Sequence, residues 1–219
     1  MTGRRADRNP AREAMVAHQL RGRGIRDERV LRVMGELPRE LFVPGWRSEL
    51  AYEDGALPIA AGQTISQPYV VARMTELLAP REGDLVLEVG TGSGYQSAVL
   101  AMLGCKVVSY ERQPELAETA RRRLAQLGLG DNVEVRLGDG SAGDPGGQLY
   151  DGILVTAAAP RIPDRLREQL AEGGRLVIPV GPRDHQQLVV VERHGNEWRE
   201  RSDGPVVFVP LVGEGGYRE

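Results

Sequence analysis

Hydrophobic positions follow one spacing before residue 84 and a different one after it. Before residue 84, apolar residues recur at helical spacing, first within 15–20 and then in a segment that follows Asp27, a good N-cap residue. A third segment with this spacing begins at Pro68. The stretch 41–63 is rich in Gly, Pro and Ala and is predicted to form loops or short strands. The pattern therefore predicts a helical N-terminal part.

From residue 84 onward, short apolar runs alternate with segments of helical spacing. The expected strands are 85–89, 106–110, 133–137, 152–156 and 175–180, and the expected helices are 95–103, 114–127 and 163–170. Strands and helices that alternate at this spacing indicate βαβ units and a parallel sheet. After residue 180 no helix is expected, and the runs 188–193 and 206–211 predict an antiparallel hairpin at the sheet edge.

The predicted fold class is therefore α/β, with a doubly wound, mainly parallel sheet, an antiparallel C-terminal hairpin and an N-terminal helical extension. The change of pattern also suggests a division of the chain. Residues 1–80 are expected to form a helical and loop region that contributes to a substrate site, and residues 81–219 to form the domain that contains the sheet.

Composition narrows the range of partners. The net charge is −3 and the basic residues are scattered, so the basic footprint that nucleic acid binding requires is missing. No apolar segment follows the Arg-rich start at 4–12, and no run reaches about 18 apolar residues. Cys105 is the single cysteine, and the three histidines form no cluster with it. We expect a cytoplasmic protein with no disulfide, no metal site, no membrane contact and no nucleic acid partner.

A glycine-rich loop, Gly90-Thr-Gly-Ser-Gly94, directly follows the expected strand 85–89. Such a loop lets a ligand approach the backbone beside the positive end of a helix, although a sharp turn without a ligand is the alternative. The sixth position is Tyr95, which departs from the dinucleotide-binding pattern. The carboxylate of Glu88 suits a ligand with an ammonium and a sulfonium better than a pyrophosphate. The candidate ligand-binding residues here are Glu88, Gly90, Gly92 and Gly94.

Two further acidic residues follow the next two expected strands. Glu111 lies 21 residues after Gly90, where βα geometry places a carboxylate over the ribose of a bound nucleoside. Asp139 precedes Gly140, and an Asp acceptor beside a backbone N–H can recognise adenine. Taken alone, Glu111 can be a solvated residue before the helix at Pro114, and Asp139 part of an ordinary turn. Together the three features predict an adenosine site at the carboxyl edge of a parallel sheet.

Six segments, in this order, resemble the protein-L-isoaspartate O-methyltransferase family over about residues 14 to 212. The segments are Gly62–Tyr69, Val86–Gln96, Gly138–Gly140, Tyr150–Pro160, Gly173–Gly181 and Phe208–Leu211. Many methyltransferases share the glycine loop. The stretches Gln63-Thr-Ile-Ser-Gln-Pro68 and Thr156-Ala-Ala-Ala-Pro160 are specific to this family.

The resemblance implies the Rossmann-like fold of class I methyltransferases, with S-adenosylmethionine bound by residues 81–219. It implies a protein-repair reaction on the free α-carboxylate of L-isoaspartyl residues, and also on D-aspartyl residues, in damaged proteins. By the same resemblance Ser66 is the catalytic-site serine, Glu111 binds the ribose, and Asp139 with Gly140 binds the adenine. Glu88 stands where some relatives have Asp, so the charge is kept and the contact it makes is left open.

The chemistry of this reaction agrees with the residues at hand. A carboxylate with a reference pKa of about 3.5 to 4 is already ionised at pH 7, so it needs no general base, and the chain offers no His-Asp or Cys-His pair. The hydroxyls of Thr64 and Ser66 can orient such a carboxylate and leave a lone pair free to attack in line with the sulfur. The alternative for Ser66 is an N-cap role before Pro68.

Two other functions are compatible with the sequence. The first is a carboxyl methyltransferase that acts on a small molecule, and the second is a non-catalytic module that only binds isoaspartyl residues. The intact glycine loop, Ser66 and Glu111 argue against the second. The oligomeric state is open, and a monomer is expected.

Overall fold

A computed structural model describes residues 9–218, in which seven strands form one sheet. The Arg-rich start up to Arg8 lies outside the described residues. The strands are β3 (Leu85–Val89), β4 (Lys106–Glu111), β5 (Val133–Leu137), β6 (Tyr150–Val155), β7 (Leu170–Val180), β8 (Gln186–His194) and β9 (Glu197–Val206), in the order β5-β4-β3-β6-β7-β8-β9. β3 to β7 pair in parallel, whereas β8 and β9 pair antiparallel. The predicted fold class is confirmed.

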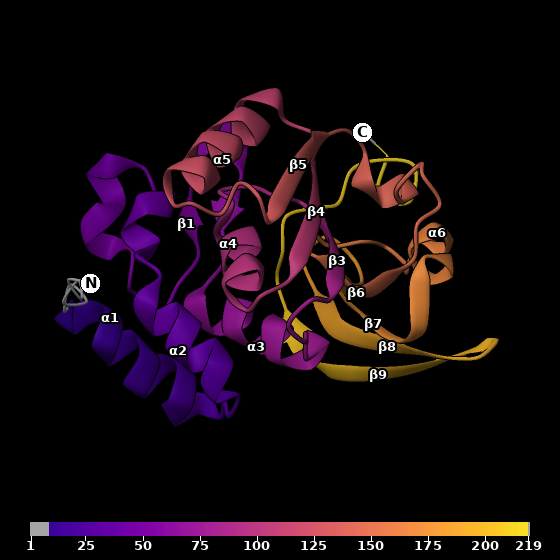
Figure 1. The fold of residues 1–219 in the computed structure, drawn as a ribbon, viewed down its shortest axis with the longest axis horizontal. Coiled ribbons are helices and arrows are strands. Elements are labelled where there is room, and N and C mark those ends of the chain that lie inside the picture. The colour runs from indigo at the N-terminus through magenta and orange to yellow at the C-terminus, as the bar shows by residue number, and fades with distance from the viewer. Residues whose placement is uncertain (1–8, 219) are drawn as a thin grey trace.

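Helices cover both faces of this sheet. Figure 1 shows α3 (Pro68–Leu78), α4 (Tyr95–Met102) and α5 (Pro114–Gln126) on one side and α6 (Asp164–Glu168) on the other. Neighbouring strand residues point to opposite sides, so Val86 belongs to the hydrophobic cluster that includes α4, whereas Leu87 packs with Leu166 of α6. Because both faces are covered, the central strands β3 and β6 are mostly apolar, whereas the edge strand β5 exposes Glu134 and Leu137.

The N-terminal segment is helical, as predicted, and packs onto the same core as the sheet. Its elements are α1 (Pro10–Ala14), the π-helix η1 (Met15–Leu20), α2 (Glu28–Glu36), the 3₁₀ turns η2 (Arg21–Arg23), η3 (Arg39–Phe42), η4 (Gly45–Leu50) and η5 (Ala60–Gly62), and the short pair β1 (Leu57–Pro58) and β2 (Thr64–Ile65). The Asp27 side chain accepts from Arg29 N and caps α2. Residues 15–78 contribute to the same hydrophobic cluster as β3 and α4. The proposed division after residue 80 stays a prediction.

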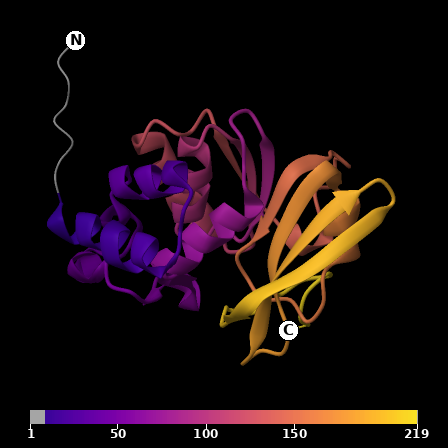
Figure 2. The same ribbon diagram turned by 90° about the horizontal axis from the view of Figure 1, so that it is seen from below.

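The second strand of the C-terminal hairpin was misplaced by the sequence pattern. We expected it at 206–211, but β9 ends at Val206, and β8 and β9 turn at Gly195, which has a φ of 61°. β9 is an edge strand with mostly exposed, charged side chains, so it carries no apolar alternation. Figure 2 shows the hairpin at the end of the molecule away from the N-terminal helices.

The apolar run 206–211 lies mostly outside the sheet. It leaves the sheet after Val206, and its backbone exchanges hydrogen bonds with Ala158 at Val209 and Leu211. Here the side chains of Val209 and Leu211 line a cavity. A second boundary also differs, because the helix expected at 163–170 ends at Glu168 and Leu170 already begins β7.

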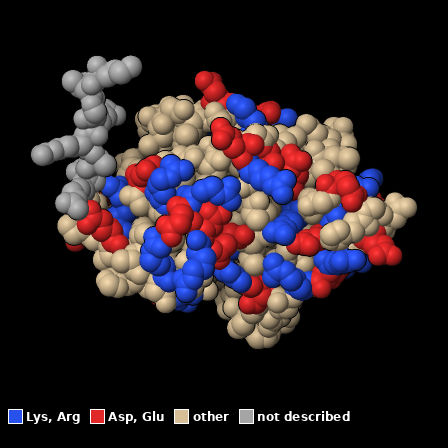
Figure 3. Space-filling view, turned by 60° about the horizontal axis from the view of Figure 1, so that its bottom comes forward, with Lys and Arg blue, Asp and Glu red and all other residues tan. Residues whose placement is uncertain are grey.

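Charges of both signs are interspersed over the face in Figure 3. Ion pairs of the described residues include Arg21–Glu28, Arg23–Asp54 and Arg73–Asp203, the last joining α3 to β9. Attraction between these charges therefore acts within local pairs rather than as a field of one sign. In the part of the chain that the structure describes, no helix has the length and apolar character needed to cross a bilayer.

Candidate active site

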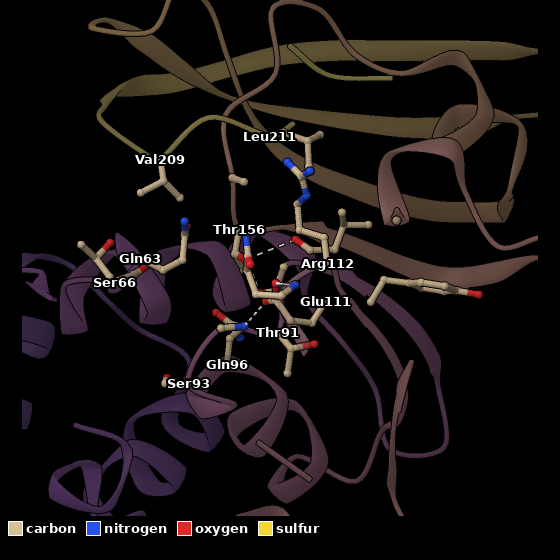
Figure 4. A pocket seen from close by; sticks show the side chains of 18 of the residues that line it. Gln63, Ser66, Thr91, Ser93, Gln96, Glu111, Arg112, Thr156, Val209 and Leu211 are labelled. Carbon is tan, nitrogen blue, oxygen red and sulfur yellow. Dashed lines mark hydrogen bonds between the residues drawn. The ribbon is translucent and has the colours of Figure 1, made fainter. Parts of the chain in front are cut away.

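A cavity lies outside the carboxyl ends of the central strands, where the strand order reverses between β3 and β6. This switch point is the place where open α/β sheets bind ligands. Four strand ends line it, together with the segments 63–66 and 209–212, which lie far apart in the sequence. In Figure 4, Ser66 and Gln63 lie across the cavity from Glu111 and Arg112. The structure therefore brings most of the predicted site residues to one place.

The glycine loop permits close packing around this cavity. Gly90 has a φ of 100°, and a Cβ there would overlap Thr156 Oγ1. A Cβ on Gly140 would lie 2.7 Å from Tyr110 Cβ. Gly92 also lines the cavity, whereas Gly94 stands at the N-cap of α4 outside it. Side chains at Gly90 and Gly140 would displace the walls of the cavity, so these glycines fix its shape.

The carboxylate of Glu111 is held in one orientation at the end of β4. Its side chain is buried, Oε2 accepts from Gly92 N at 2.8 Å, and Oε1 accepts from Gln113 N at 2.9 Å. Each carboxylate oxygen has a second acceptor position free. Glu111 therefore offers two fixed acceptors to the cavity, an arrangement that suits two neighbouring hydroxyl groups of a sugar.

Asp139 also lines the cavity but is tied to the C-terminal segment. Oδ1 accepts from Ser141 N at 2.9 Å and from Ser141 Oγ at 2.6 Å, and Oδ2 accepts from Glu214 N at 2.8 Å. A further acceptor position remains on Oδ2. The predicted pair Asp139 and Gly140 thus sits beside Glu111, with the final residues of the chain packed against it.

Glu88 does not line the cavity, contrary to the contact we expected. Its side chain points to the α4 side of β3, is fully buried, and accepts hydrogen bonds from Ser97 Oγ and from Ser109 Oγ, the latter at 2.6 Å. Ser109 Oγ lies 2.6 Å from Thr91 Oγ1, and Thr91 lines the cavity. The alternation of strand side chains turns Glu88 under the glycine loop. Its link to the cavity is the chain of hydrogen bonds through Ser109 and Thr91.

Burial dominates the ionisation of Glu88. It raises the pKa of this carboxyl to about 7, against the hydrogen bonds from Ser109 and Ser97, which lower it, while the charge of Glu111 raises it further. Among the described residues, Oε1 has no hydrogen-bond partner. A group with a raised pKa in the folded state binds more protons than it does unfolded, so it stabilises the fold less as pH rises.

Glu88→Gln should therefore change how stability depends on pH. In the wild type, this residue should lower the free energy of unfolding by up to about 3 kcal/mol as pH rises from 4.5 to about 7, and Gln should remove that contribution. Urea unfolding at pH 5 and pH 8 measures the difference. Glu53→Gln, at an exposed carboxylate, is the control. The same pH dependence in the wild type and Glu88→Gln would contradict the assignment.

Ser66 and Thr64 contribute free hydroxyls to the cavity, and Figure 4 shows Ser66 across it from Glu111. Both residues line it, and neither hydroxyl has a hydrogen-bond partner within residues 9–218. The N-cap residue of α3 is Gln67, and no side chain accepts a capping hydrogen bond at the start of this helix. The alternative N-cap role for Ser66 is therefore wrong. The two hydroxyls are available to a ligand.

Sequence reasoning missed Arg39, which holds Ser66 in place through a hydrogen bond to its backbone carbonyl. Its guanidinium is fully buried and donates from Nη2 to Ser66 O at 2.8 Å and from Nε to Ala51 O at 2.7 Å. It also lies over the Tyr95 ring, 4.8 Å from the centroid, and burial lowers the pKa of Arg39. No local pattern marks this arginine, because its partners are carbonyls from distant segments.

Thr156 and Gln96 were missed as well. Thr156 lies at the end of β6 and its hydroxyl donates to Gly90 O at 2.5 Å. The strand-end rule that found Glu111 would have found it too. Gln96 lies in α4 beside the loop, at the end of the segment Val86–Gln96 that resembles the family, but the sequence assigned it no contact with the cavity.

A doubly wound sheet with an antiparallel C-terminal hairpin, a glycine loop after β3 and a fixed acid after β4 define the Rossmann-like methyltransferase fold. The family model described as protein-L-isoaspartate(D-aspartate) O-methyltransferase matches residues 11–216. The chain belongs to this family.

Individual relatives agree with the family model. A protein-L-isoaspartate O-methyltransferase of Methanoregula boonei is 55% identical over 210 residues, 96% of either chain. The protein of the same name from Aeropyrum pernix is 52% identical over 97% of this chain and 85% of its own length. A solved structure of a protein-L-isoaspartate O-methyltransferase matches with a TM-score of 0.82 at 29% identity, over 93% of this chain and 66% of that one.

Proposed function

We propose that this protein transfers the methyl group of S-adenosylmethionine to the free α-carboxylate of L-isoaspartyl residues in damaged proteins, and that D-aspartyl residues are also substrates. The observation that carries the proposal is the pair of free hydroxyls, Ser66 and Thr64, in the same cavity as the fixed carboxylate of Glu111. The relatives' shared name supports the same substrate class.

The lining residues fit this cofactor. The two free acceptor positions of Glu111 match the ribose hydroxyls, Asp139 and Gly140 match the adenine, and the glycine loop with Gly90 and Gly92 leaves room for a ligand against the backbone. When bound, S-adenosylmethionine supplies an electrophilic methyl group on a sulfonium. Glu88 and Gly94, outside the cavity, support this site indirectly, through Thr91 and through the start of α4.

Ser66 and Thr64 would bind the substrate carboxylate and orient it. Hydroxyl donors fix one oxygen and leave lone pairs on the other, whereas a direct arginine contact would hold the nucleophile more firmly in its ground state. Arg39 does not contact the substrate carboxylate directly in this arrangement, because its guanidinium binds the backbone carbonyl of Ser66. No His or Cys stands among the described lining residues, which agrees with a nucleophile that is ionised at pH 7.

The two segments 63–66 and 209–212 would form the walls of the peptide groove. Residues before 81 thus contribute the catalytic hydroxyls, and residues 81–219 contribute most of the cofactor site, as the proposed division of the chain has it. A groove that recognises mainly the displaced backbone of an isoaspartyl linkage would accept many sequences. A cytoplasmic location and a monomeric state remain predictions.

Labelled methyl transfer to a pair of peptides tests the proposal. One peptide carries L-isoaspartate and its twin carries aspartate at the same position. We expect label in the first peptide alone. Equal labelling of both peptides, or labelling of a small carboxylic acid instead, would replace the substrate assignment. No transfer together with tight binding of the isoaspartyl peptide would indicate a non-catalytic binding module.

A further inference from the structure

Gln96 lies in the cavity wall, and neither the motifs nor the family comparison assigns a role to it. It lies in the first turn of α4, is 7% exposed, and lines the cavity with Ser93, Ser66 and Met74. Figure 4 shows it near Thr91 and Ser93, away from Leu211. A buried amide in this position needs partners for its polar atoms, and the structure supplies only one of them.

The orientation of the Gln96 amide follows from its partner. Gln96 Nε2 lies 2.9 Å from Thr75 Oγ1, and Thr75 Oγ1 lies 2.8 Å from Val71 O. Val71 O is a carbonyl and can only accept, so the single hydroxyl proton of Thr75 goes to it. Thr75 must then accept from Gln96, which makes the bonded atom the NH₂ group. Gln96 Oε1 is therefore the atom left free, and it has no partner among residues 9–218.

The free oxygen belongs to α4, a wall of the cavity that contributes no carboxylate. The two acidic lining residues, Glu111 and Asp139, belong to the strand ends β4 and β5, and Glu88 is sealed under the glycine loop. A methyl donor with its ribose at Glu111 and its adenine at Asp139 would have its sulfur and amino-acid end at the remaining part of the cavity, which Gln96 and Ser66 line. That end carries an ammonium with three N–H donors, which need acceptors inside the protein.

We infer that Gln96 Oε1 accepts a hydrogen bond from the ammonium group of the methyl donor, and that Thr75 holds the amide in the orientation that makes this possible. The inference rests on the proposed function. A neutral amide suits this place better than a carboxylate, because the neighbouring residue Ser97 already donates to the buried Glu88. A second anion here would raise the pKa of both groups.

Two ligands that differ only in the amino-acid end test this inference by calorimetry. S-adenosylhomocysteine has that end, and 5′-methylthioadenosine keeps the nucleoside and the sulfur without it. For Gln96→Met, we expect S-adenosylhomocysteine to bind about 10- to 100-fold more weakly, the effect of one lost hydrogen bond to a charged group. Binding of 5′-methylthioadenosine should stay within about twofold of the wild type, which also shows that the variant is folded.

Thr75→Val is the second variant, because it keeps the volume of the side chain and removes the hydroxyl that orients the amide. It should weaken S-adenosylhomocysteine by roughly 3- to 10-fold with the same selectivity. Glu111→Ala is the matched control and should weaken both ligands. Equal losses for both ligands in Gln96→Met, or no loss for either, would overturn the inference. If the wild type binds neither ligand, the proposed function fails and the inference fails with it.

Discussion

Replacing Glu111 with alanine should weaken the binding of S-adenosylhomocysteine by about 100-fold or more. The change removes two acceptors that Gly92 N and Gln113 N hold in place, so a ribose would lose two charge-assisted hydrogen bonds. Each such bond contributes about 1.5 to 3 kcal/mol. The backbone N–H groups of Gly92 and Gln113 would also lose their partner, which loosens the glycine loop.

Calorimetric titration measures this loss directly. Glu115→Ala changes an exposed acid four residues further on, in the first turn of α5, and should leave the affinity unchanged. Glu111→Gln keeps one acceptor but turns an NH₂ group toward one of the two backbone donors, so an intermediate affinity is expected. Wild-type affinity in Glu111→Ala would show that the nucleoside does not bind at the end of β4.

Ser66→Ala should lower kcat on an isoaspartyl peptide by about 100-fold while the affinity for S-adenosylhomocysteine stays unchanged. The hydroxyl is free in the structure and faces the cavity, so its loss affects the substrate carboxylate and leaves no buried partner unpaired. A positioned hydrogen-bond donor that acts in the transition state is worth about 100- to 1,000-fold in rate. The Arg39 contact to the Ser66 carbonyl does not depend on the side chain, so the loop should keep its place.

Steady-state kinetics and thermal unfolding together test this prediction. Ser48→Ala removes a hydroxyl that donates to Gly45 O in η4, away from the cavity, and should leave kcat unchanged. Thr64→Val should show a smaller loss of rate than Ser66→Ala, since one donor would still orient the carboxylate. A normal kcat in Ser66→Ala accompanied by a lower Tm would mean that the serine stabilises the loop and takes no part in the reaction.

Much of the fold was predictable because local pattern and tertiary environment agree. The apolar runs of β3, β4, β6 and β7 are buried on both faces, and the helices between the parallel strands have the expected spacing. Where the environment differs, the pattern misled us. β9 is an exposed edge with charged side chains, and the apolar run after it lines a cavity instead of pairing in the sheet. A sequence pattern reports burial, and it does not say whether a strand or a cavity wall provides that burial.

In the candidate site, too, some residues were predictable from the sequence and others were not. Glu111, Asp139 and the glycines follow strands directly, and parallel strands bring their carboxyl ends to one edge, so the sequence by itself determined that these residues meet. Only the tertiary structure decided what stands opposite them. It placed Arg39 behind Ser66 and left Gln96 Oε1 free, because these contacts join segments whose separation along the chain leaves no local trace.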